Sequence, residues 1–149
     1  MLLKPNAENA CFGCGGANSR GMLLTFEQDD VARRIRGAFR LGAEYQGGAG
    51  FVHGGIIATV LDEVMGKVAR FRDAHAVTAE LSVEYLKPVR VDTDLIVEGY
   101  EVEAKGRNLF FEGEIRDGVG LLLARGRGRF VIVGSRAPGN ADGESAETK

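Results

Sequence analysis

The sequence contains no tryptophan, two cysteines and three prolines among its 149 residues. Two cysteines cannot build a disulfide framework. Basic residues are not in excess, since 19 Lys and Arg face 21 Asp and Glu, and the net charge of -2 argues against a nucleic-acid-binding protein. No apolar run approaches the roughly 20 residues of a membrane span, and the N-terminus has no apolar core of a secretory signal. We therefore expect a cytoplasmic protein that binds neither nucleic acid nor membrane.

The amino-acid composition is that of one ordinary domain with a sizeable core, because 44% of the residues are hydrophobic and 27% are charged. The 22 glycines lie mostly where turns and strand ends are expected. Periodicity and bulky apolar residues stop near the C-terminus, which predicts a disordered tail. The expected division is a lead-in segment at 1–20, a globular domain at 21–134 and the tail at 135–149.

One long helix and six strands are predicted. The helix is expected at 54–72, where apolar residues cover most of its circumference and demand a cover on most sides. Alternating or clustered apolar residues predict strands at 22–29, 31–41, 77–85, 93–103, 108–116 and 119–133. Short turns between them, including the Asp117-Gly118 hairpin signal, favour antiparallel pairing. The sequence therefore predicts an α+β fold, an antiparallel sheet of about six strands wrapped around one helix.

The strand at 77–85 alternates regularly. We expect Val77 and every second residue up to Tyr85 to point inward, and Thr78 to point to the opposite face, outward or toward a partner.

Two glycines open the predicted helix. A helix start presents unpaired N–H groups and a partial positive charge, and glycine lets another molecule approach the backbone closely. Gly54 and Gly55 therefore suit an oxyanion hole, with N–H donors aimed at a carbonyl oxygen that gains negative charge. The alternative interpretation is a tight turn packed against the sheet.

Two acidic residues lie inside the apolar helix. Asp62 has no charged neighbour at helical spacing, and burying an unpaired carboxylate is costly. It must therefore face a cleft, a water molecule or a polar partner, either as a catalytic carboxylate or as an aspartate bonded to a neighbouring strand across a dimer interface. Glu63 precedes Lys67 by four residues, which favours a solvated or rim ion pair.

Three stretches together resemble a known family. They are YQGGAGFVHGGIIATVLDEVMG at 45–66, VTAELSVEYLKPV at 77–89 and EAKGRNLFFEGEI at 103–115. They are similar to hotdog-fold acyl-CoA thioesterases of the phenylacetic-acid-degradation type and to the human thioesterase-superfamily proteins, over roughly residues 22–133. The lead-in CFGCGGANSRGM also resembles the start of many members.

The resemblance implies roles for particular residues. Asp62 matches the family's nucleophile or general base, and Gly54 with Gly55 matches the pair that polarises the thioester carbonyl. Thr78 aligns with a Ser or Thr of the family's site. His53 is a supporting residue that holds the preceding loop or contacts the thioester.

The remaining candidates contact substrate. Gln46 is a candidate for a contact to the thioester carbonyl. Glu63 is a second candidate for a contact to the substrate. Comparable turns in the family bind the nucleotide portion of coenzyme A, which suggests Tyr85 and the basic turn with Lys105, Arg107 and Asn108. Alternating arginines at 125, 127 and 129 form a second candidate phosphate patch. No cofactor is implied.

Helix geometry predicts a shared site. Gly54 and Asp62 lie eight residues apart, which is roughly 12 Å along a helix. An oxyanion donor and an attacking group must both lie about 3 Å from one thioester. The two groups must then come from different subunits, which predicts a homodimer with two shared sites. The family's dimers often pair into tetramers.

Two other functions stay open. A hotdog dehydratase or hydratase would use a histidine base and a facing acid, and His53 and Glu63 are its candidates. A non-catalytic acyl-CoA-binding domain would not need Asp62. The Cys11-x-x-Cys14 motif lacks a second ligand pair for zinc and a thioredoxin-like context for redox activity. We therefore predict no metal site and expect this segment to pack against the acyl pocket or the dimer partner.

Overall fold

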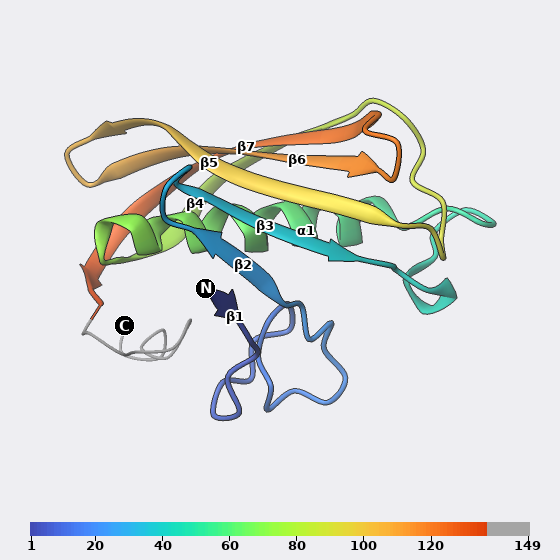
Figure 1. The fold of residues 1–149 in the computed structure, drawn as a ribbon, viewed down its shortest axis with the longest axis horizontal. Helices are drawn as coiled ribbons and strands as arrows, with labels where there is room; N and C mark the ends of the chain where they lie inside the picture. The colour runs from blue at the N-terminus through green and yellow to red at the C-terminus, as the bar shows by residue number, and fades with distance from the viewer. Residues whose placement is uncertain (137–149) are drawn as a thin grey trace.

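The computed structural model describes residues 1–136, so most of the tail predicted at 135–149 lies outside the described residues. One seven-stranded antiparallel sheet has the order β1-β2-β3-β5-β6-β7-β4. The strands are β1 (Leu2–Leu3), β2 (Phe26–Asp29), β3 (Arg34–Phe39), β4 (Ala74–Tyr85), β5 (Leu95–Lys105), β6 (Asn108–Asp117) and β7 (Leu122–Ser135). The sheet curves around a single long helix (Figure 1). This confirms the α+β hotdog arrangement, with β1 as the additional strand.

The helix α1 (Gly54–Gly66) continues as the 3₁₀ helix η2 (Lys67–Arg72), so the helical pattern ends where the sequence predicted. Asp73 stops it in the left-handed conformation, with a φ of 49°. A short 3₁₀ helix, η1 (Ala43–Tyr45), precedes α1. No helix in the described part of the chain is both long and apolar enough to cross a membrane.

The second predicted strand starts too early. Val31 is 97% exposed, and its N–H and that of Ala32 donate to the Asp29 carboxylate. Arg33 then adopts a positive φ of 55°. Val31 and Ala32 therefore belong to a turn closed by an aspartate side chain, and β3 begins only at Arg34.

A row of glycines brings α1 close to the sheet. Gly99, Gly113 and Gly126 are register partners on β5, β6 and β7. A methyl group at Gly99 would lie 2.9 Å from the backbone oxygen of Val64, and one at Gly126 would lie 3.0 Å from Met65. These glycines lie inside strands rather than at strand ends, because side chains there would push the helix away from the sheet.

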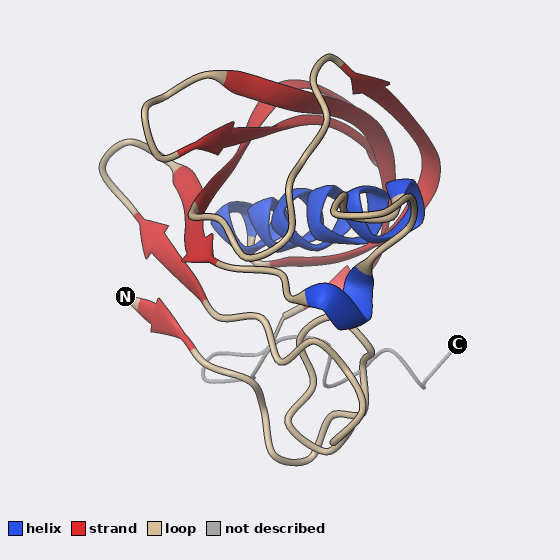
Figure 2. Cartoon of the chain, turned by 90° about the vertical axis from the view of Figure 1, so that its right-hand side faces the viewer, coloured by secondary structure: helices blue, strands red, loops and turns tan. Residues whose placement is uncertain are grey.

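The core lies between the helix and the concave face of the sheet. Ile57, Val60, Leu61, Val64 and Met65 of α1 are at most 1% exposed. Figure 2 shows the sheet curved around the helix, while the irregular N-terminal loops lie below it. One helix thereby fills the whole concave face, so its polar residues can face only the free edge of the sheet or the N-terminal segment.

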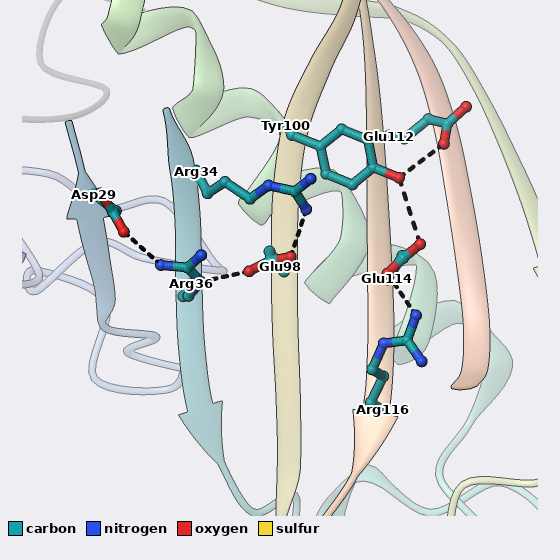
Figure 3. A network of polar contacts seen from close by, with 8 residues as sticks. All are labelled: Asp29, Arg34, Arg36, Glu98, Tyr100, Glu112, Glu114 and Arg116. Atoms are coloured by element: carbon teal, nitrogen blue, oxygen red, sulfur yellow. Dashed lines mark hydrogen bonds and ion pairs between the residues drawn. The ribbon is translucent and has the colours of Figure 1, made fainter. Parts of the chain in front are cut away.

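The convex face of the sheet carries charge. Figure 3 shows a network of alternating acids and arginines across β2, β3, β5 and β6, formed by Asp29, Arg34, Arg36, Glu98, Tyr100, Glu112, Glu114 and Arg116. The candidate phosphate patch extends this network, since Arg125, Arg127 and Arg129 pair with Glu84, Glu112 and Glu80. These three arginines are engaged with acids on the convex face and do not form an open anion patch.

Candidate active site

The start of α1 is capped by the residue before it. His53 accepts the Gly55 N–H at its Nδ1 (2.8 Å), and its carbonyl accepts the N–H groups of Ile56 and Ile57. This side-chain cap satisfies one of the orphan donors of the helix. The Gly55 amide is therefore engaged, whereas no hydrogen bond within residues 1–136 uses the N–H of Gly54, which is an exposed residue.

The loop before the helix is held by its own side chains. Gln46 accepts the Gly50 N–H at its Oε1 (2.8 Å), and Gly47 donates to the Phe51 carbonyl. The side-chain carbonyl of Gln46 thus shapes the glycine-rich loop beside His53. A contact from Gln46 to the substrate would therefore come from its side-chain amide nitrogen.

Tyr85 joins the helix start to strand β4. Its hydroxyl donates to the Gly54 carbonyl at 2.8 Å, although the residue is 56% exposed. The predicted substrate-contacting residue therefore lies beside the glycine pair and helps to fix the position of Gly54.

Asp62 is held from the opposite end of β4. The Thr78 hydroxyl donates to Asp62 Oδ1 at 2.7 Å, within one chain. Burial raises the pKa of Asp62, the hydrogen bond from Thr78 acts in the opposite direction, and the nearby Cys11 charge raises it further. The structure thus brings together two residues that the sequence placed on separate elements, and leaves Asp62 Oδ2 for another contact.

This contact corrects the predicted orientation of β4. Thr78 pairs with the buried Phe130, while Glu80 pairs with Arg129 on the convex face, so a β-bulge at Ala79 shifts the register. One extra residue reverses the alternation. Thr78 therefore faces the helix and Val77 faces outward, contrary to prediction, whereas the inward direction predicted for Leu81, Val83 and Tyr85 is correct.

The sequence predicted that Glu63 forms a solvated or rim ion pair with Lys67. The predicted exposure to solvent is wrong, because both side chains are largely covered. Lys67 is only 7% exposed and its ammonium lies 5.5 Å from the centre of the Phe26 ring. Burial raises the pKa of Glu63 to about 7, while a hydrogen bond from Cys14 and the positive charge of Lys67 lower it. The N-terminal segment covers Glu63, and Cys11 Sγ lies 3.7 Å from its Oε2.

The basic turn lies at the Thr78 end of the sheet. Asn108 pairs with Val131, and Val131 pairs with Val77. Lys105 is paired with Glu103 but keeps 72% of its side chain exposed. Arg107 donates to the Ile132 carbonyl, and Asn108 accepts from Arg129. Lys105 and Arg107 are thus both exposed, but the Arg107 guanidinium is bound to a backbone carbonyl and the Lys105 ammonium to Glu103.

The candidates form two groups at opposite ends of β4. One group contains Asp62, Glu63, Thr78 and the basic turn. The other contains Gln46, His53, Gly54, Gly55 and Tyr85. Sequence reasoning did not identify the cysteine pair as a neighbour of Glu63. The CxxC spacing was visible, but nothing in the sequence showed which part of the helix it contacts.

Comparison with known proteins adds the family context. A family model of the thioesterase superfamily matches residues 49–124, half of the chain. Acyl-coenzyme A thioesterase THEM4 of Rattus norvegicus is 38% identical over 78 residues, which are 52% of this chain and 34% of that protein. The chain thus matches about a third of the length of this curated relative.

Solved structures give the same fold. A thioesterase superfamily protein superposes with a TM-score of 0.77 at 30% identity, over 82% of this chain and 60% of that chain. A Bacillus halodurans protein solved with CoA has a TM-score of 0.64 at 29% identity, over 74% of each chain.

Proposed function

Because the chain belongs to the thioesterase superfamily, we propose that it hydrolyses an acyl-CoA thioester to the free acid and CoA. The observation that carries this proposal is the Asp62 carboxyl group on the helix, which is partly buried and held by the Thr78 hydroxyl at 2.7 Å. Support comes from the THEM4 relative, named as an acyl-CoA thioesterase, and from the Bacillus halodurans structure with CoA.

Asp62 acts on the thioester carbonyl. Its Oδ1 is fixed by Thr78, so Oδ2 either removes a proton from an attacking water or attacks the carbonyl carbon itself. The thiolate of CoA then leaves, and a weakly basic thiolate needs no strong general acid. After direct attack, water hydrolyses the acyl–Asp62 anhydride, which releases the free acid and regenerates the carboxylate. Incorporation of heavy oxygen from solvent in a single turnover separates the two routes, because only direct attack places the label first in the Asp62 carboxylate.

Gly54 supplies the main oxyanion donor in this proposal. Its N–H lies at the start of α1, where the helix dipole is positive, and Gly54 is an exposed residue. The Gly55 N–H is already bound by His53, so Gly55 contributes chiefly by having no side chain beside the carbonyl. The capping role of His53 also leaves the hydratase alternative without a free Nδ1 base.

The two groups of site residues meet across a dimer in this proposal. β4 is an edge strand that pairs only with β7 among the described strands. It exposes Val77, Leu81 and Tyr85, each more than a third accessible. Antiparallel pairing of two β4 edges about a centre near Leu81 places Thr78 of one protomer opposite the Tyr85 end of its partner, and so brings Asp62 toward the partner's Gly54. Pairing of such dimers into a tetramer remains part of the proposal.

The CoA phosphates are assigned to the basic turn. It lies at the Thr78 end of the sheet, and Lys105 keeps most of its side chain in solvent. The cytoplasmic setting expected from the sequence is proposed together with this activity, because acyl-CoA is the substrate class.

Release of free thiol from a panel of aryl-, short-chain and medium-chain acyl-CoAs tests the activity. We expect Asp62→Asn to lower kcat by about 10²- to 10⁴-fold, the usual contribution of a general base. Asp30→Asn, an exposed aspartate outside the site, is the matched control and should retain full activity. Hydration of an enoyl thioester without thiol release, or an unchanged rate in Asp62→Asn, would contradict the assignment.

A further inference from the structure

Two free thiols, for which the sequence predicted no redox activity, lie together beside the candidate active site, and the proposed hydrolysis does not use them. Cys11 is partly buried and Cys14 is 9% exposed. Their Sγ atoms and a carboxylate oxygen of Glu63 all lie within 4.8 Å of one another. The two sulfurs thus belong to one cluster on the surface of α1.

The turn that carries the thiols is held by its backbone. Gly15 donates to the Cys11 carbonyl (2.9 Å), and the carbonyls of Phe12 and Gly13 accept from Met22 and Leu24. The Cys11 N–H donates to Asn9 Oδ1 at 2.7 Å. A methyl group on Gly13 would lie 2.4 Å from Glu63 Cδ, so the turn packs directly against the Glu63 side chain, which a larger residue at position 13 would have to displace. Both thiols are therefore prepositioned on the same side of a fixed turn.

The two thiols differ in character. A hydrogen bond from Cys14 lowers the pKa of Cys11 to about 5, against the opposing effect of burial. The same interaction, together with burial, raises the pKa of Cys14. In thiol–disulfide exchange an accessible thiolate attacks the disulfide, and a second thiol then resolves the mixed disulfide. A more accessible thiolate beside a buried protonated thiol fits these two roles. The charge of Lys67 acts on the whole cluster, which stabilises a thiolate and opposes a divalent cation.

From this geometry we infer that Cys11 and Cys14 are a reversible redox site, which forms an intramolecular disulfide by exchange with a small disulfide of the glutathione class. Cys11 is the attacking thiol and Cys14 is the resolving thiol. The inference stands apart from the proposed hydrolysis, because its readout is the covalent state of the two sulfurs.

The exchange balances in two steps. The Cys11 thiolate attacks one sulfur of glutathione disulfide, which forms a mixed disulfide and releases one glutathione thiolate. Cys14 then passes its proton to Glu63 and attacks Cys11 Sγ, which forms the Cys11–Cys14 bond and releases the second glutathione thiolate. The protein dithiol loses two electrons and glutathione disulfide gains them. The proton on Glu63 leaves to solvent.

The test equilibrates the full chain in glutathione buffers of increasing oxidised fraction, quenches with acid, alkylates free thiols and measures intact mass. As the oxidised fraction rises, the doubly alkylated protein should be replaced by an unalkylated form whose mass is two hydrogens below that of the reduced, unalkylated chain. Dithiothreitol should reverse this change. Cys14→Ser should stop as a mixed disulfide with one glutathione on Cys11. Cys11→Ser should stay unmodified, because the remaining thiol is buried. Double alkylation at every ratio, or equal adducts on either single variant, would overturn the inference.

Two controls keep the result interpretable. Each variant is compared with the parent protein by thermal unfolding, and Cys14→Ala replaces Cys14→Ser if the serine variant loses the native transition. A parallel series with zinc alone and with chelator tests the competing chemistry. If zinc binds stoichiometrically and the metal-free native protein resists glutathione disulfide, the cluster is a metal site and the redox assignment is wrong.

Discussion

At the scale of single residues, the contact between Thr78 and Asp62 is the smallest unit of the proposed chemistry. A hydrogen bond to an ionised group contributes about 1.5–3 kcal/mol, so Thr78→Val should lower kcat by roughly 10- to 100-fold if the bond orients the carboxylate throughout the reaction. Thr78→Ser keeps the hydroxyl and should restore most of the rate. Thiol release measured at saturating acyl-CoA gives the comparison, and equal losses in both variants would indicate disturbed packing instead.

The ionisation of Asp62 belongs to the same scale. A base or nucleophile must be ionised, and burial raises the pKa of Asp62 above its ordinary value of 3.8. Activity should therefore be full above the raised pKa and should fall as the pH drops through it, with an acid limb at higher pH than an ordinary aspartate would give.

Cys11 offers a way to move this limb. Its negative charge raises the pKa of Asp62, so Cys11→Ser should shift the acid limb of kcat/KM toward lower pH. Profiles of the two proteins, followed by loss of the thioester absorbance, give the comparison. A shift in the opposite direction would remove Cys11 from the electrostatics of the site.

Among the secondary-structure elements, the glycine row shows how the sheet admits the helix. Gly99→Ala would place a methyl group 2.9 Å from the Val64 carbonyl oxygen on α1, an atom that cannot rotate away. Overpacking of this kind costs about 1–3 kcal/mol, so the free energy of unfolding in urea should fall by that amount. Gly134→Ala is the matched control, because nothing lies within 4 Å of its added methyl group. Equal stability of the two variants would refute the close approach.

The same elements show how far the sequence could be read. Apolar periodicity located the helical segment α1–η2 and the strands after it, because helices and strands each leave a local pattern in the sequence. It misassigned the faces of Val77 and Thr78, because the bulge at Ala79 depends on pairing with β7 rather than on local composition. The inward residues after the bulge were correct, since the alternation resumes there.

Glu63 shows a second limit. Its spacing to Lys67 pointed to a positive charge that does act on Glu63, but the cover over Glu63 comes from the turn around Cys11, 52 positions away in the chain. Helical spacing carries no information on what a non-periodic N-terminal segment will contact. Long-range burial, and with it the raised pKa of Glu63, therefore required the structure.

For the whole molecule, the separation of the two residue groups demands a partner. Within one chain Gly54 lies at the Tyr85 end of β4, and Asp62 lies at the Thr78 end. If two protomers share each site, an Asp62→Asn protomer and a Gly54→Val protomer should restore one intact site when they pair. Random refolding of an equal mixture should then recover about one quarter of the parental activity, because half of the dimers are mixed and each has one good site.

A second mixture distinguishes shared sites from simple stabilisation by a partner. Asp62 and Thr78 contact each other within one chain, so an Asp62→Asn protomer paired with a Thr78→Val protomer leaves a defect in both sites. This mixture should show no more activity than its parents, although its dimers form equally well in analytical ultracentrifugation. Recovery in both mixtures, or in neither, would mean that the amide and the carboxylate do not meet across the two β4 edges.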